Sequence, residues 1–133
     1  MTLEPLLAAP LATQIHAFVA IGAFVIGIIQ LSRAKGDGAH RALGYAWVAM
    51  MMVIAASSFR IHHINQWHGF SWIHLLSILV LVNAPLAVMH ARGGNIRRHK
   101  LSMIGLFVGA LLVAGAFTFL PGRIMHAVAF GPQ

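Results

Sequence analysis

Residues 11–32 read LATQIHAFVAIGAFVIGIIQLS, an apolar run that contains no charged side chain. A helix needs about 20 apolar residues to cross the hydrocarbon core of a bilayer, which is about 30 Å thick. We therefore predict that this run forms a membrane-spanning helix. No basic residue precedes it and no convincing cleavage site ends it, so we expect a retained first span and not a signal peptide.

Three further apolar runs follow the first one, at about 42–61, 71–89 and 101–120. The connections between the four runs are short, and short connections make consecutive helices antiparallel neighbours. The pattern predicts an all-α fold, an integral membrane four-helix bundle with up-down-up-down topology that fills residues 1–133 as a single domain. In such a bundle the first and third helices face each other diagonally, as do the second and fourth.

The composition supports lipid as the solvent and excludes several classes of function. Of the 133 residues, 59% are hydrophobic and 8% are charged, which is too little polar surface for a water-soluble globule. The net charge of +7 comes from residues between the apolar runs, so we expect no nucleic-acid partner. The chain has no cysteine, and its two acids, Glu4 and Asp37, lie outside the spans. Thiolate sites, iron–sulfur clusters and carboxylate-bridged metal pairs are therefore excluded.

The basic residues predict the orientation of the bundle. The first and third loops hold Arg33, Lys35, Arg41, Arg92, Arg97, Arg98 and Lys100, and the opposite side holds Arg60 and Arg123. Cytoplasmic loops of membrane proteins retain Lys and Arg. We expect a bacterial inner-membrane protein with both termini in the periplasm.

Helices three and four carry two features that bear on their packing. Pro85 lies inside the third run and removes a backbone donor, so we expect a kink there, with the nearby Asn83 pointing into the bundle. Gly105 and Gly109 form a small-xxx-small pair on the fourth run, and such pairs permit close approach of helices.

Histidine is the unusual residue of this chain, with nine copies. His16 and His74 each lie about one turn inside the outer boundary, on the diagonal first and third helices. His40 and His99 lie just before the second and fourth helices, at the inner boundary. Two b-type haems, each held by two histidines, require this arrangement, because haem iron takes axial imidazoles on opposite faces of its ring. The adjacent Arg41 and Arg98 would neutralise haem propionates.

The alternate-helix histidine pattern resembles the four-helix core of the cytochrome b561 group. Proteins of that group carry two haems and move electrons across membranes to or from ascorbate, quinones or ferric iron. The resemblance implies one or two haems b, an electron carrier or membrane oxidoreductase, and quinone or a redox subunit as a partner. His90, near the inner end of the third helix, is a substitute candidate for the inner ligand. The segment HRALGY at residues 40–45 is also similar to a bacterial family of predicted membrane proteins of unknown function.

A second constellation competes for the outer histidines. His62, His63, His68 and His126 join His16 and His74 on that side, and clusters of imidazoles suit Cu or Zn. That interpretation predicts a non-haem accessory or assembly subunit working in a homo- or hetero-oligomer. His62 and His63 are adjacent and would point about 100° apart on a helix, so one of them at most enters the core. For any single histidine, a structural hydrogen bond to a neighbour is the simplest alternative.

Overall fold

The computed structural model describes residues 1–61 and 72–131. Within these ranges, four helices are long and apolar enough to cross a membrane. They are α2 (Leu11–Ser32), α3 (Gly38–Ser58), α4 (Trp72–Arg92) and a composite fourth span. The fourth span consists of α5 (Ile96–Gly105), the π-helical segment η1 (Leu106–Val113) and α6 (Ala114–Phe117). Two short helices, α1 (Glu4–Leu7) and α7 (Ile124–Phe130), lie near the termini.

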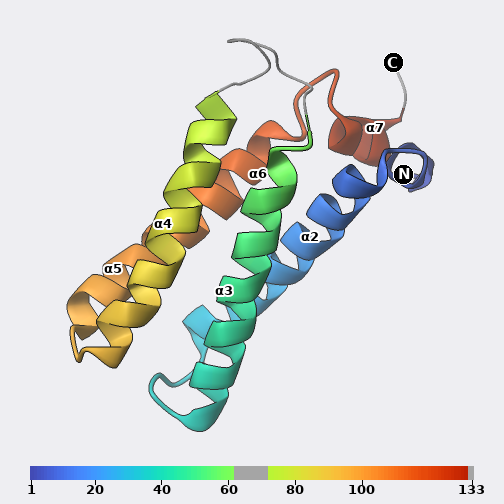
Figure 1. Cartoon of the computed structure of the whole chain (residues 1–133). Coiled ribbons are helices and arrows are strands. Elements are labelled where there is room, and N and C mark those ends of the chain that lie inside the picture. Colours follow the sequence, from blue (N-terminus) through green and yellow to red (C-terminus); the bar gives the residue numbers. More distant parts are fainter. Residues whose placement is uncertain (62–71, 132–133) are drawn as a thin grey trace.

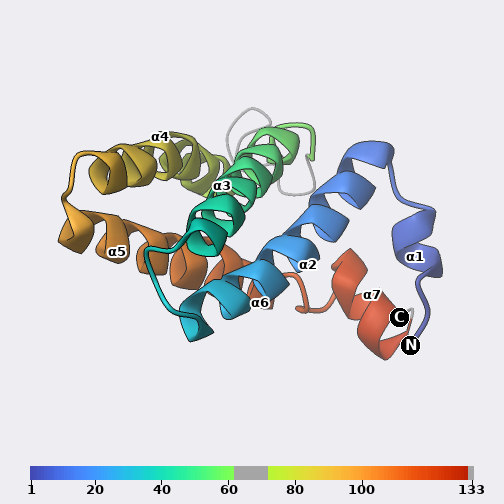
Figure 2. The same cartoon turned by 90° about the horizontal axis from the view of Figure 1, so that it is seen from below.

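The four spans pack in chain order and form the predicted bundle (Figure 1). Helix α2 packs against α3, α3 against α4, and α4 against α5 and η1, while η1 returns to contact α2. We call the end with the turns at 33–37 and 93–95 the inner end, and the end with both termini the outer end. At the outer end α1 lies beside α7 (Figure 2). The all-α membrane bundle is therefore confirmed.

The predicted starts of the second and fourth spans are wrong. Helix α3 begins at Gly38 and α5 at Ile96, because the side chains of Asp37 and Asn95 cap them. Asp37 accepts a hydrogen bond from the backbone N–H of His40 at 2.7 Å, and Asn95 accepts one from Arg98 at 3.2 Å. Such caps satisfy N–H groups that have no partner within the helix. His40 and His99 consequently lie inside helices and not before them.

The third span extends beyond its predicted end, and Asn83 does not lie where it was predicted. Helix α4 runs on to Arg92 with Pro85 in its interior, and the kink expected at Pro85 stays a prediction. Asn83 lies in an open groove between α4 and the α5–η1 segment instead of in the core, and its Nδ2 donates to the carbonyl of Leu79 at 2.9 Å. Gly105 and Gly109 line the same groove, and a methyl group added at either would meet no atom within 4 Å.

An apolar core fills the middle of the bundle, between the two ends that carry the predicted histidines. Its closest packing is at Gly27, where an added methyl group would lie 2.5 Å from the Phe107 ring. The indole of Trp47 donates to the carbonyl of Ala23 at 3.0 Å and joins α3 to α2. The buried core residues are Ala23, Trp47, Met51, Ala55, Val80, Ala84, Leu106, Phe107 and Leu111.

The outward surface of the spans is also apolar. Val25 is 51% exposed, Leu79 53% and Leu101 63%, on three different spans. Soluble monomers rarely expose apolar surface on this scale. The apolar outer surface and the four long apolar helices are those of a membrane protein whose spans contact lipid.

Candidate functional site

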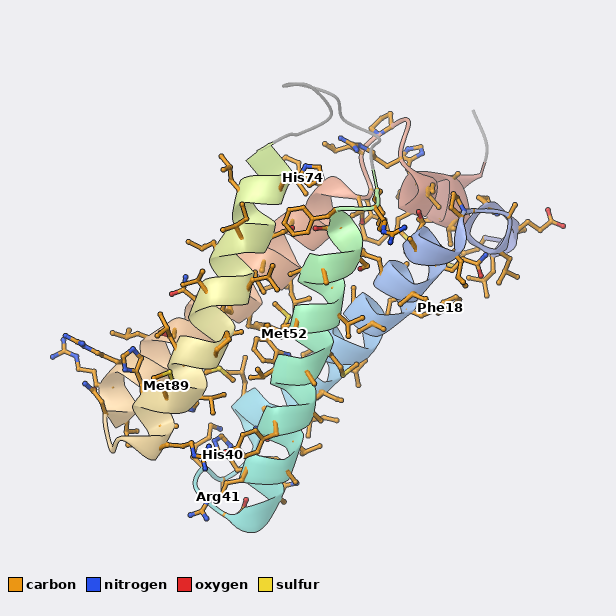
Figure 3. The ribbon with its side chains drawn as sticks, viewed as in Figure 1. Phe18, His40, Arg41, Met52, His74 and Met89 are labelled. Atoms are coloured by element: carbon orange, nitrogen blue, oxygen red, sulfur yellow. The ribbon has the colours of Figure 1, made fainter. Side chains whose placement is uncertain are left out.

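The inner end brings His40 and His99 together from diagonal helices. Their ring centroids lie 6.4 Å apart and their ring planes are nearly perpendicular, at 83°. Figure 3 shows His40 at the inner end of α3, far from His74 at the opposite end of α4. The predicted inner pair is thus a pair in space. Both rings are partly buried.

The His40 ring is held by Gln30, at the inner end of α2. The Nε2 atom of Gln30 lies 3.2 Å from His40 Nδ1 and donates to the His40 carbonyl at 2.9 Å. The other carboxamide atom, Gln30 Oε1, is buried and has no hydrogen-bond partner in the described ranges. Three spans therefore meet at this point, since Gln30 joins α2 to the α3–α5 pair.

The His99 ring is held by the fourth neighbour, α4. Its Nδ1 lies 2.8 Å from the carbonyl oxygen of Ala87, which can only accept, so Nδ1 donates. A histidine that donates Nδ1–H to a backbone carbonyl presents a fixed Nε2 lone pair, which is the usual support for a metal-ligating imidazole. His99 is therefore oriented as a ligand would be.

Basic side chains flank the inner pair on the exposed surface. Arg41 and Arg98, the predicted propionate partners, are exposed beside the two histidines, and Figure 3 places Arg41 next to His40 on α3. Arg33 pairs with Asp37 at 3.6 Å. His90, the substitute candidate, is partly buried near the inner end of α4, where its carbonyl accepts from Asn95 N–H at 2.8 Å.

The outer pair has different contacts from the inner pair. His16 contacts α3 itself, and His74 contacts Phe59, the residue that ends α3. His16 Nδ1 lies 3.0 Å from Ser57 Oγ, and that hydroxyl donates to the carbonyl of Ile54. His74 is 3% exposed and its ring packs against Phe59, with centroids 5.4 Å apart. No hydrogen bond or ring contact between His16 and His74 occurs among the described residues.

A serine pair reinforces this outer layer. The hydroxyls of Ser58 on α3 and Ser77 on α4 share a hydrogen bond, and both are buried. A carbonyl of its own helix also lies within hydrogen-bond distance of each hydroxyl, Ala55 at 2.6 Å from Ser58 Oγ and Ile73 at 3.1 Å from Ser77 Oγ. Each hydroxyl has one hydrogen, so one serine donates to its carbonyl and the other donates to that serine. Polar groups at the outer end therefore tie α2 to α3 and α3 to α4.

The alternative outer metal site falls largely outside the described residues, because His62, His63 and His68 lie there. His126 is described and lies on α7, where its ring stands 5.0 Å from that of Phe130. Within residues 1–61 and 72–131, no three His or acidic side chains are close enough to hold a metal ion.

Two groups of the inner site, Gln30 and the carbonyl of Ala87, were not predicted from the sequence. A signal for Gln30 was available, because Gln30 lies about four helical turns after His16 and so shares its face of α2. The Ala87 carbonyl carries no such signal, since every residue has one. Its availability depends on how α4 and α5 pack.

Comparison with known proteins assigns the chain to a family. No curated protein and no solved structure matches it. A family described as "Predicted membrane protein (DUF2306)" matches residues 13–129, which include both histidine pairs and all but the first two residues of the four spans. The protein is therefore a member of this family of predicted membrane proteins.

Proposed function

We propose that the protein is a b-type haem electron carrier whose inner histidines, His40 and His99, bind the haem iron. The observation that carries the proposal is the meeting of these two rings across the bundle, 6.4 Å apart. Two metal–imidazole bonds of about 2.0–2.1 Å, and roughly 1 Å from each nitrogen to its ring centre, add to about 6 Å. The separation suits one metal ion between the rings.

The small number of protein ligands favours haem over a bare metal ion at this site. A structural zinc site needs four ligands, and a catalytic one usually takes three from the protein. Two imidazoles meet at the inner end, those of His40 and His99, and among the described residues no third His or acidic side chain joins them in a metal-binding group. Haem supplies four nitrogens itself, so two histidines complete the coordination of its iron. Bound haem would supply one-electron chemistry, while Arg41 and Arg98 would neutralise its propionates.

The outer pair stands as a second proposed centre, in which His16 would have to turn from Ser57 toward His74. His16 and His74 share a depth on the diagonal helices α2 and α4, as a second pair of ligands would. An ionisable residue within a membrane commonly marks a functional site. In this form of the proposal, the electron crosses between the two centres and is exchanged with quinone or with a redox subunit.

An absorption spectrum of the purified protein tests the proposal. Protein expressed with ample haem and solubilised in detergent should show the reduced-minus-oxidised bands of a b-type cytochrome. A pyridine haemochrome assay gives the number of haems per chain. His40→Ala or His99→Ala should remove the inner haem, whereas His126→Ala, at the other end of the bundle, should not. Wild-type protein without haem under these conditions overturns the proposal, and metal analysis of that protein then measures Cu and Zn.

A further inference from the structure

The hydrogen bonds at the inner end assign a tautomer to each histidine of the pair. A carboxamide nitrogen can only donate hydrogen bonds, and it has two hydrogens to donate. Gln30 Nε2 therefore donates one to the His40 carbonyl and one to His40 Nδ1. Because Nδ1 accepts, neutral His40 carries its proton on Nε2.

His99 has the opposite tautomer. Its Nδ1 donates to the Ala87 carbonyl at 2.8 Å, so Nδ1 carries the proton and Nε2 keeps a lone pair. A metal ion binds an imidazole nitrogen through its lone pair. With the Nδ1 atom of each ring already engaged, Nε2 is the remaining ligand atom on each, and it is available on His99 alone.

Gln30 also carries an atom that would give His40 a lone pair on Nε2, as His99 already has. Its Oε1 is buried and has no hydrogen-bond partner in the described ranges. Rotation of the carboxamide would bring Oε1 toward His40 Nδ1 and would break both Nε2 contacts, the one to Nδ1 and the one to the His40 carbonyl. An oxygen at that place accepts a hydrogen bond, so it would favour the His40 form with its proton on Nδ1 and a lone pair on Nε2. The imidazole stays neutral, because one proton leaves Nε2 and one arrives at Nδ1.

We propose that Gln30 is a positioning residue that sets the tautomer of His40. Without haem, Gln30 holds His40 in the form whose Nε2 cannot ligate, and metal binding requires the carboxamide to turn. The second statement rests on the proposed function, whereas the first concerns the haem-free protein alone. Groups that orient a metal-ligating histidine commonly change metal affinity about 10–100-fold when they are altered.

Two substitutions at Gln30 separate its donor from its acceptor. In Gln30→Glu the carboxylate can only accept, so His40 should change to the form with its proton on Nδ1. In Gln30→Met a side chain of similar length has neither a strong donor nor a strong acceptor, so neither form of His40 should be favoured. Gln14→Glu is the matched control, because Gln14 lies at the other end of α2 and donates to the carbonyls of Leu7 and Ala9.

Nitrogen-15 NMR of the haem-free protein in detergent reads the tautomers directly. The wild type should show His40 protonated on Nε2 and His99 on Nδ1, and Gln30→Glu should change His40 alone. Haemin titration should then give an affinity about tenfold or more higher for Gln30→Glu than for wild type, with Gln14→Glu unchanged.

The outcomes distinguish this proposal from the proposed function. Wild-type His40 protonated on Nδ1 would overturn the role of Gln30. Tautomers as expected, with no haemin bound by any variant, would overturn the haem function and support Gln30 as the residue that sets the tautomer. Equal haemin affinity for wild type and Gln30→Glu would overturn the carboxamide rotation. If Gln30→Glu does not fold, the wild-type spectrum and that of Gln30→Met test the first statement.

Discussion

The inner and outer histidine pairs have the same pattern in the sequence but different surroundings in the structure. At the inner end the rings of His40 and His99 meet, and Gln30 and the Ala87 carbonyl hold them from the other two spans. At the outer end His16 bonds to Ser57 on the adjacent helix instead of facing His74. Shared depth on diagonal helices is therefore not enough to make a pair. The direction in which each side chain leaves its helix decides whether two residues meet.

The largest expected effect concerns which end of the molecule faces the cytoplasm. The inner end holds the seven basic residues of the two turns and their flanks, and cytoplasmic loops retain such residues. Alkaline phosphatase fused to the C-terminus should be active, and the same enzyme inserted after Gly94 should be inactive. A cytoplasmic fluorescent reporter at the two sites should give the reverse result. If both reporters give the opposite pattern, the inner pair lies at the periplasmic face.

A second prediction compares the two pairs by their haem content. His40→Ala should abolish the inner haem, because one imidazole cannot fill both axial positions. His16→Ala should leave that haem unchanged, since His16 bonds to Ser57 at the other end of the bundle. The haem content of each variant, measured by pyridine haemochrome assay, gives the result. If two haems per chain fall to one in His16→Ala, the outer pair is also a haem site.

A third prediction concerns the region between the two pairs. In Gly27→Ala the new methyl group would lie 2.5 Å from the Phe107 ring, so either that ring must shift or α2 and η1 must separate. Overpacking of this kind costs about 1–3 kcal/mol of unfolding free energy. Gly109→Ala is the control, because its methyl group meets no atom within 4 Å and alanine favours a helix by up to about 1 kcal/mol. Denaturant unfolding in detergent measures both. Equal losses would show that the contact at Gly27 is unimportant.

The sequence predicted the spans well where hydropathy alone marks them. The predicted first span, 11–32, has the same bounds as α2. The starts of α3 and α5 were wrong, because Asp37 and Asn95 extend these helices into polar sequence through single hydrogen bonds, which hydropathy does not report. The replacement of α-helix by η1 was not predicted either, since its eight residues, LFVGALLV, have no distinctive signal.

The candidate site was predicted less completely than the spans. Apolar run length and loop length predicted which end of the bundle His16, His40, His74 and His99 occupy and the diagonal relation of their helices. They placed His40 and His99 before α3 and α5, whereas both lie inside these helices. They did not predict that His16 would turn toward Ser57, because that choice depends on the rotation of α2 about its own axis. The helix caps are local side-chain hydrogen bonds, whereas this rotation depends on packing, and hydropathy reports neither of them. The interactions that distinguish the two pairs are therefore the ones that hydropathy could not reveal.

The smallest expected effect is at the cap that places His40. Asp37→Ala removes the side-chain acceptor of the His40 N–H, a loss that typically costs about 1 kcal/mol. The first turn of α3 should then fray, so haemin should bind more weakly at the inner pair while the bond between His16 and Ser57 is retained.

Asp37→Asn is the control, because it keeps an acceptor oxygen and removes only the ion pair with Arg33. The two side chains of that ion pair are 39% and 50% exposed. Exposed pairs of this kind contribute about 0–1 kcal/mol. Denaturant unfolding and haemin titration measure both variants. Equal loss of affinity in the two would assign the effect to charge, whereas loss in Asp37→Ala alone would assign it to the cap. Helix α2, which carries His16, begins at Leu11, and its N-cap residue Pro10 makes no side-chain hydrogen bond.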